Sequence, residues 1–171
     1  GILLSLVAVC TAKAAFAQEA WVFASEIPCA TAPVYGVPFN QCWISNKRTF
    51  RIGSVQSWRL TYADSKSEVA VGLYRLVEAN GAGGMPPVAG GAGMIEWIRA
   101  ADSLKSVTSG GTGWTLSGSE AVTFQKSQRQ CIAFVRNGQP NWILGAALCR
   151  DSASPIAPGE AAFIADAIKV R

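Results

Sequence analysis

The chain of 171 residues contains no histidine. This absence excludes Ser-His-Asp and Cys-His catalysis, because both use an imidazole as the general base. It also excludes c-type haem attachment, which requires a Cys-x-x-Cys-His motif. No two cysteines have the Cys-x-x-Cys spacing of a common zinc site, and the usual phosphate-binding and nucleophile motifs are absent. The sequence therefore predicts no metal and no cofactor.

Charge is sparse as well. Charged residues make up 15% of the chain, and the formal net charge is only +4. The basic residues are scattered, apart from a small cluster of Lys47, Arg48 and Arg51. Proteins that bind nucleic acid concentrate basic charge on one face. We therefore expect no nucleic-acid partner.

An apolar run at residues 1–10 has the length of a secretory signal core. It is followed by Ala15 and Ala17, which form an A-x-A site for signal peptidase. A membrane-spanning helix would need roughly 20 apolar residues, and Lys13 interrupts the run. We therefore predict a cleaved signal peptide at 1–17, a periplasmic or secreted protein, and no stable membrane span after cleavage.

The remaining residues, 18–171, are predicted to form a single exported domain. Half of the chain is apolar and six residues are Trp, so a core can form without help from a metal. Six glycines and two prolines occur at 80–93, a composition that excludes a helix or a central strand. We interpret this stretch as a long loop within the domain.

Hydrophobic periodicity assigns the segments around this loop. Residues 55–62 alternate as a half-buried strand, and 63–67 have the composition of a turn. Residues 68–77 fit either a strand or a helix, and we favour the strand. Apolar residues at three- and four-residue spacing predict an amphipathic helix within 94–104. The glycine-rich stretch 109–113 is predicted to be a turn.

The cysteines after the leader are expected to form disulfides, as thiols do in an oxidising compartment. Residues 131–149 have the pattern of a β-hairpin with its turn at a Gly-Gln-Pro sequence. A symmetric register places Cys131 opposite Cys149, within disulfide range. This pairing leaves Cys29 with Cys42. Four cysteines permit three connectivities, and the hairpin register alone selects this one.

The end of the chain is predicted to be a helix packed on the sheet. Its start, at 158–160, places a proline and a carboxylate where a helix N-terminus favours them. Its predicted apolar stripe consists of Phe163, Ile164, Ala167 and Ile168. The expected fold class is α+β: a single domain with an antiparallel sheet, a disulfide-stapled hairpin and a packed C-terminal helix.

The segments 131–136, 144–149 and 158–160 together resemble the ending of small, uncharacterised exported proteins of Gram-negative bacteria. The likeness covers the C-terminal third of the chain. It implies the same arrangement of hairpin, disulfide and helix, and it implies no activity.

Two classes of function remain open. We favour a non-catalytic binding or protein-interaction module over an enzyme, with an envelope or extracellular protein or glycan as its partner. Trp142, beside a turn and near Arg136 and Asn137, is the candidate binding site, because Trp and Arg dominate protein-contact surfaces. The alternative is a small hydrolase acting on an envelope or extracellular polymer with a pair of carboxylates. Its candidate residues are Glu96, Asp102, Glu120 and Asp151.

Overall fold

The computed structural model describes residues 23–81, 84–85, 108–116, 119–138 and 141–171. The predicted signal peptide at 1–17, most of the 80–93 loop and the predicted helix within 94–104 lie outside these residues.

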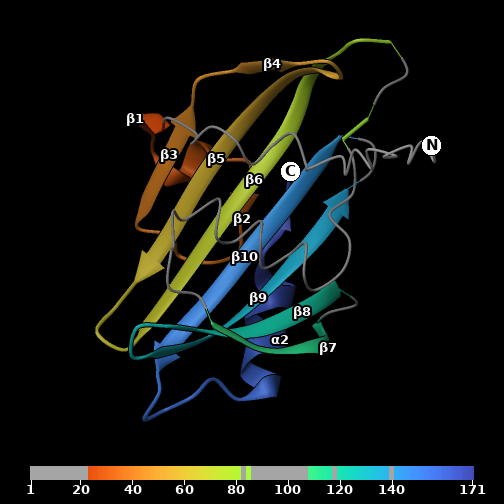
Figure 1. The fold of residues 1–171 in the computed structure, drawn as a ribbon. Coiled ribbons are helices and arrows are strands. Elements are labelled where there is room, and N and C mark those ends of the chain that lie inside the picture. Colours follow the sequence, from red (N-terminus) through yellow and green to blue (C-terminus); the bar gives the residue numbers. More distant parts are fainter. Residues whose placement is uncertain (1–22, 82–83, 86–107, 117–118, 139–140) are drawn as a thin grey trace, which may run out of the picture.

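The described chain consists mainly of strands (Figure 1). The first part contains β1 (Phe23–Glu26), the 3₁₀ turn η1 (Cys29–Thr31), β2 (Val34–Tyr35), β3 (Gln41–Ser45), β4 (Arg48–Phe50), β5 (Gly53–Ala63) and β6 (Ser67–Ala79). The second part contains β7 (Thr108–Leu116), β8 (Ser119–Lys126), β9 (Arg129–Gly138), β10 (Trp142–Asp151), α2 (Pro158–Ala167) and β11 (Lys169–Val170).

Two antiparallel meanders join to make one large sheet. Its strand order is β1-β3-β5-β6-β10-β9-β8-β7, and β4 also pairs with β5. Strands β3 to β6 follow one another in the chain, as do β7 to β10. The junction is the pairing of β6 with β10, which brings together segments far apart in sequence. Helix α2 and the small β11–β2 sheet lie on one face of the large sheet (Figure 1).

The segment that fitted both helix and strand is strand β6, as we favoured. It forms a long hairpin with β5, in which Trp58 faces Leu73. The predicted turn between these strands is confirmed. Its Asp64 carboxylate accepts the backbone N–H groups of Lys66 and Ser67 at 2.8 and 2.7 Å. These hydrogen bonds to the charged form, together with one from a tyrosine hydroxyl, lower the pKa of Asp64.

The predicted turn at 109–113 is wrong, because these residues belong to β7, at the edge of the sheet. The pairing of β7 with β8 shifts register between Ser109 and Gly111, and again between Gly111 and Trp114. Such irregularities tolerate glycine, and they are common at sheet edges. Glycine therefore marks an irregular strand here and not a chain reversal.

The hairpin of β9 and β10 has the predicted register. Cys131 stands opposite Cys149, and Ala133 stands opposite Ala147. Both predicted disulfides are present: the Cα atoms are 4.1 Å apart in the Cys131–Cys149 pair and 5.3 Å apart in the pair formed by Cys29 and Cys42. Two disulfides are typical of a protein from an oxidising compartment.

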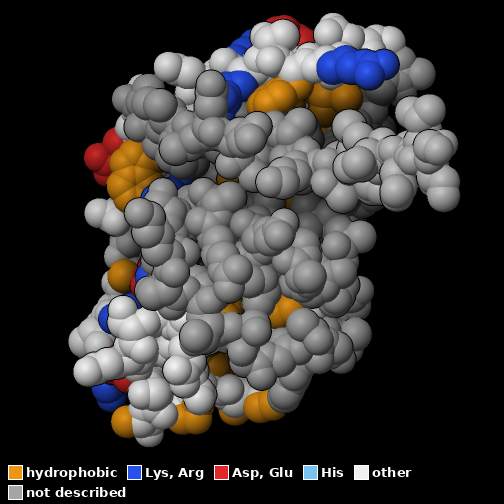
Figure 2. Space-filling view, in the orientation of Figure 1, with side chains coloured by type: hydrophobic (Ala, Val, Ile, Leu, Met, Phe, Trp, Pro, Cys, Tyr) orange, Lys and Arg blue, Asp and Glu red, His pale blue; other side chains and the backbone are white. Residues whose placement is uncertain are grey.

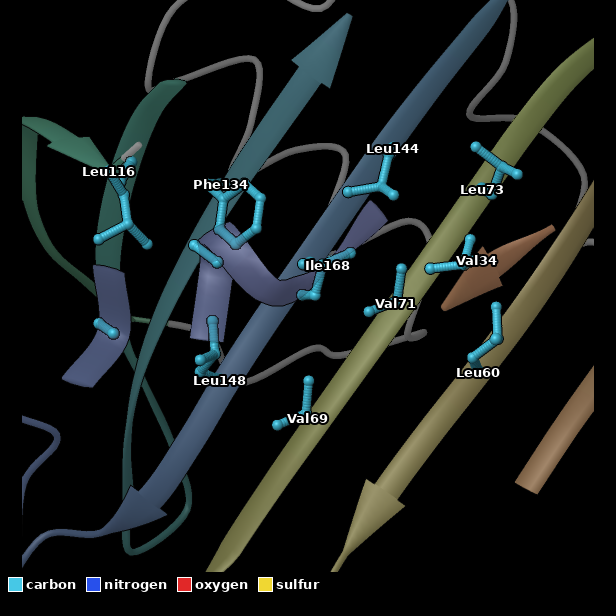
Figure 3. Close-up of a cluster of buried hydrophobic side chains, with 14 of the residues drawn as sticks. Val34, Leu60, Val69, Val71, Leu73, Leu116, Phe134, Leu144, Leu148 and Ile168 are labelled. Carbon is cyan, nitrogen blue, oxygen red and sulfur yellow. The ribbon is translucent and has the colours of Figure 1, made fainter. Parts of the chain in front are cut away.

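The main core lies between the large sheet and the elements that cover it (Figure 3). Leu60, Val71 and Phe134 project from three strands, and none is more than 1% exposed. Ile168 and Val34 contact them from the covering side. The alternation of side chains along each strand thus directs one full set of apolar residues toward α2, β11 and β2.

Helix α2 begins at Pro158, as predicted, but the face that it buries coincides only in part with the predicted stripe. Ala161 and Ala165 are fully buried, whereas Phe163, a member of the predicted stripe, is 75% exposed. Small side chains at the contact let the helix backbone approach the sheet closely, and a phenylalanine there would hold it away. The predicted stripe is therefore wrong at Phe163, and it is right at Ile164, which packs against the core, and at Ile168, which is fully buried.

After α2 the chain turns into strand β11, which pairs with β2. The approach of the two segments is close, since a Cβ at Gly36 would overlap the carbonyl of Ala167. Gly36 also has a φ of 97°, which favours glycine. A C-terminal helix packed on an antiparallel sheet is thus correct in outline. Among the described residues, however, sheet predominates, and α2 is the single α-helix.

Candidate functional site

Aromatic and arginine side chains meet on the face of the sheet that carries α2. Position 75 of β6 stands opposite Trp142 of β10 on one side and Gln56 of β5 on the other. Facing residues in antiparallel strands project to the same side, and Trp58, two positions after Gln56, shares that side. The guanidinium carbon of Arg75 lies 6.0 Å from the centre of the Trp58 ring, within cation–π range.

The ring of Trp142 lies against the neighbouring strand at Gly138, its partner in the β9–β10 hairpin. A Cβ at Gly138 would overlap the ring atoms of Trp142. Glycine is therefore required at this position for the observed ring placement. The indole is half-buried and packs against the main core, so its orientation is fixed by the fold.

The C-terminal segment adds a second stacked pair. The pairing of β11 with β2 places Arg171 over the ring of Tyr35, 5.1 Å from its centre. The backbone N–H of Arg171 donates to the carbonyl of Pro33 at 2.8 Å. Its main-chain oxygen accepts a hydrogen bond from the Arg75 guanidinium. The two pairs are thereby joined, and we call Tyr35, Trp58, Arg75, Trp142 and Arg171 the aromatic–arginine surface.

The structure separates the three residues of the predicted site. Arg136 shares the face of Trp142, because it stands opposite Leu144. Asn137 is the next residue of the same strand, so it points to the other face of the sheet. Trp142 thus belongs to the aromatic–arginine surface, and Asn137 lies across the sheet from it.

Arg136 is engaged in the fold. Its guanidinium donates to the carbonyls of Ala165 at 2.5 Å and Ile168 at 2.8 Å, at the end of α2. It also lies 5.0 Å from the centre of the Phe134 ring. Burial lowers the pKa of Arg136, and the nearby Asp166 carboxylate opposes this shift. Arg136 therefore satisfies carbonyls that the helix terminus leaves without intrahelical donors.

The carboxylates of the hydrolase alternative are only partly visible. Glu96 and Asp102, and the side chain of Glu120, lie outside what the structure describes. Asp151 forms an ion pair with Arg129, with 3.6 Å between Oδ1 and Nε. Over the described residues, no group of three or more acidic or cysteine side chains could hold a metal ion.

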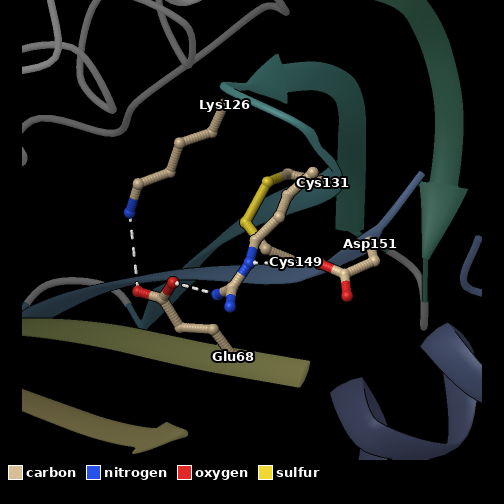
Figure 4. Close-up of a disulfide and its surroundings, with 6 residues drawn as sticks. Glu68, Lys126, Cys131, Cys149 and Asp151 are labelled. Atoms are coloured by element: carbon tan, nitrogen blue, oxygen red, sulfur yellow. Dashed lines mark hydrogen bonds and ion pairs between the residues drawn. A yellow bond between two sulfur atoms is a disulfide. The ribbon is translucent and has the colours of Figure 1, made fainter. Parts of the chain in front are cut away.

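Asp151 belongs to a charge network beside the Cys131–Cys149 disulfide (Figure 4). Glu68 of β6 pairs with Arg129 at 3.0 Å and with Lys126 at 3.5 Å. Arg129 in turn pairs with Asp151. These charges neutralise one another, so the network braces the open end of the β9–β10 hairpin, and both of its described carboxylates, Glu68 and Asp151, are paired.

The small basic cluster noted in the sequence lies at the opposite end, around β4. Figure 2 shows hydrophobic side chains beside Lys and Arg side chains at this end of the molecule. Lys47 pairs with Glu78 at 3.0 Å, and Arg48 lies 5.8 Å from the centre of the Phe50 ring. The cluster is therefore partly neutralised and partly packed on an aromatic ring.

Most of the aromatic–arginine surface could not be predicted from the sequence, because it depends on pairings between strands that are far apart in the chain. Arg75 meets Trp142 only through the pairing of β6 with β10, and Arg171 meets Tyr35 only through β11 and β2. The proximity of Trp58 to Arg75 could have been predicted. The symmetric β5–β6 hairpin places Gln56 opposite Arg75, and Trp58 is two residues further along β5. That register places the tryptophan and Arg75 on one face.

No protein-family model matches the chain, and no curated protein or solved structure is significantly similar to it. Within the described residues, no helix has both the length and the apolar character needed to cross a bilayer.

Proposed function

We propose that this protein is an exported, non-catalytic binding module that contacts a partner through the aromatic–arginine surface. The observation that carries the proposal is the joining of two arginine–aromatic pairs, Arg75 on Trp58 and Arg171 on Tyr35. Trp, Tyr and Arg are the residue types most enriched at the energetic centres of protein interfaces. Here paired strands of the two sheets hold the three aromatic residues and Arg75, which reduces the entropy lost on binding.

Some side chains of the aromatic–arginine surface are exposed, and others are held in place by packing. Tyr35 is 44% exposed, and Arg171 is exposed. Trp58, Arg75 and Trp142 are half-buried, so their positions are set by packing. A centre of anchored aromatic rings with accessible side chains at its edge is the usual anatomy of a protein interface.

Export to the periplasm or the cell exterior is the second part of the proposal. Its support is the apolar leader at 1–17 with its A-x-A site, together with the two disulfides. Intact-mass measurement of the exported protein should give a chain that starts near Gln18. Recovery of the leader on the mature protein would contradict this part.

Site-specific photo-crosslinking tests the binding role. The exported protein would carry p-benzoylphenylalanine in place of Tyr35, or in place of Lys66 as the control. Lys66 is exposed in the β5–β6 turn, nine residues along β6 from Arg75, or about 30 Å. We expect a discrete adduct from position 35 in cells of the source organism, none from position 66, and loss of the adduct in Trp142→Ala. Equal crosslinking at both positions, or none at 35, would reject the proposed surface.

A further inference from the structure

We propose that the aromatic–arginine surface recognises a carboxylate-rich peptide segment of its partner. This inference rests on the proposed function and specifies the chemistry of the bound group. Its basis is the charge at this surface and the kind of hydrogen-bonding groups that the surface presents.

The side-chain charge at this surface is positive. The segment 161–171 and the two arginines that contact it carry four positive side chains, Arg75, Arg136, Lys169 and Arg171, and one negative one, Asp166. No carboxylate side chain in the described part of the chain forms an ion pair with Arg75 or Arg171. Arg129 and Arg150, in contrast, both pair with acidic side chains. Complementary charge is what selects one partner over another at such a surface.

The surface also presents donors and few acceptors. Arginine and the tryptophan indole carry N–H donors and no acceptor. Gln56, which carries both, is buried, at 8% exposed, and its amide nitrogen donates to the carbonyl of Ser45. The hydroxyl of Tyr35 can both donate and accept. A neutral sugar presents hydroxyl groups that need acceptors as well as donors, whereas a carboxylate only accepts. A surface dominated by donors is therefore matched by carboxylates.

Stacking prepares the two arginines for this role. A guanidinium that lies over an aromatic ring keeps its planar N–H edge for in-plane acceptors, and it can hold a carboxylate through two parallel hydrogen bonds. The guanidinium carbons of Arg75 and Arg171 lie over the rings of Trp58 and Tyr35, 6.0 and 5.1 Å from their centres. One nitrogen of Arg171 also donates to the carbonyl of Ala30 at 3.4 Å. The rings also offer apolar area to the methylene groups and backbone of a peptide, as expected where Trp, Tyr and Arg form a protein contact.

The test is an NMR titration of the disulfide-bonded mature protein, in which the indole N–H signals of Trp58 and Trp142 are followed. The probe is a blocked tetraglutamate peptide, and a blocked tetraglutamine peptide is its uncharged match. We expect saturable shifts of both signals with tetraglutamate only, and weaker binding at physiological than at low ionic strength.

Arg75→Gln and Arg171→Gln should each weaken tetraglutamate binding by about fivefold or more, an effect of roughly one lost charged contact. Arg129→Gln removes a cation that is already paired, and it should leave the affinity unchanged.

Unchanged spectra, or equal shifts with tetraglutamine, would overturn the inference. Shifts with tetragalacturonate and none with tetraglutamate would replace the peptide with an acidic glycan. If the crosslink at position 35 forms while tetraglutamate fails, the binding module stands and its carboxylate specificity falls.

Discussion

Removal of Arg136 should loosen the C-terminal unit from the sheet. The guanidinium bridges two carbonyls, those of Ala165 and Ile168, and both residues are fully buried. A buried acceptor left without a donor costs about 1–3 kcal/mol. Arg136→Ala leaves two such acceptors, which predicts a loss of about 2–6 kcal/mol in the free energy of unfolding. Loss of the contact with Phe134 adds to this cost.

Arg136→Lys separates hydrogen bonding from charge. Lysine keeps a long apolar stem and a positive charge, but its single ammonium does not reproduce the planar fork that reaches two carbonyls at once. We expect a loss of about 1–2 kcal/mol for this variant, between the wild type and Arg136→Ala. The matched control is Arg129→Ala, which removes an arginine from half-exposed ion pairs and should cost about 1 kcal/mol or less.

Urea unfolding of the disulfide-bonded protein, followed by tryptophan fluorescence and by far-ultraviolet circular dichroism, measures these losses. Hydrogen exchange then locates the change: amides of α2 and β11 should lose protection in Arg136→Ala, while those of the β9–β10 hairpin keep it. A loss no greater than that of Arg129→Ala, or Arg136→Lys as stable as the wild type, would refute the role assigned to Arg136.

Three further outcomes are expected. Replacing Cys131 and Cys149 together with Ala should lower the free energy of unfolding by about 3 kcal/mol, because the bond closes a loop of sequence separation 18; a loss in urea unfolding below about 1 kcal/mol would contradict this. Gly138→Ala should displace the Trp142 ring, at a cost of about 1–3 kcal/mol, and an unchanged tryptophan emission spectrum would argue against it. The pKa of Asp64 is lowered in the folded protein, so its stabilising effect is complete above the unfolded pKa of about 4 and disappears as pH falls through the folded value. Asp64→Asn should therefore flatten the acid side of the stability–pH curve, and an identical curve would exclude this contribution.

Local pairing is the part of the fold that the sequence predicts well. In the β9–β10 hairpin the partners are fixed once the turn is placed, and this fixes the disulfide between Cys131 and Cys149. The pairing of β6 with β10 has no such rule, since a long stretch of chain separates the two strands. Arg75 is therefore brought to Trp142 by a contact that no local pattern reveals.

Two errors have simple physical causes. Helical periodicity finds apolar residues, but it does not show which of them fit a close contact, so Ala165 is buried where Phe163 was expected. Glycine content indicates a weak or irregular backbone, but it does not distinguish a turn from an edge strand with shifted register, which is how β7 uses Gly111. The error at α2 concerns packing partners far away in sequence, whereas the error at β7 concerns its irregular pairing with β8, the next strand of the chain.

The contrast between two arginines shows why the candidate site needed the structure. Arg136 and Arg75 both lie within strands, share one face of the sheet and reach the C-terminal segment. Arg136 is partly buried and donates to two buried carbonyls. Removing it leaves these acceptors without a donor, which destabilises the fold. Arg75 lies over the ring of Trp58, and within the described part of the chain its guanidinium donates to the main-chain oxygen of Arg171, which leaves further N–H donors of its five for an incoming acceptor. The sequence pointed to Arg136 as the binding residue, because it is near Trp142 along the chain. The hydrogen bonds in the structure favour Arg75, which lies opposite Trp142 in the sheet. We therefore assign Arg136 to stability and Arg75 to binding, and the variants of these two residues should separate unfolding free energy from partner affinity.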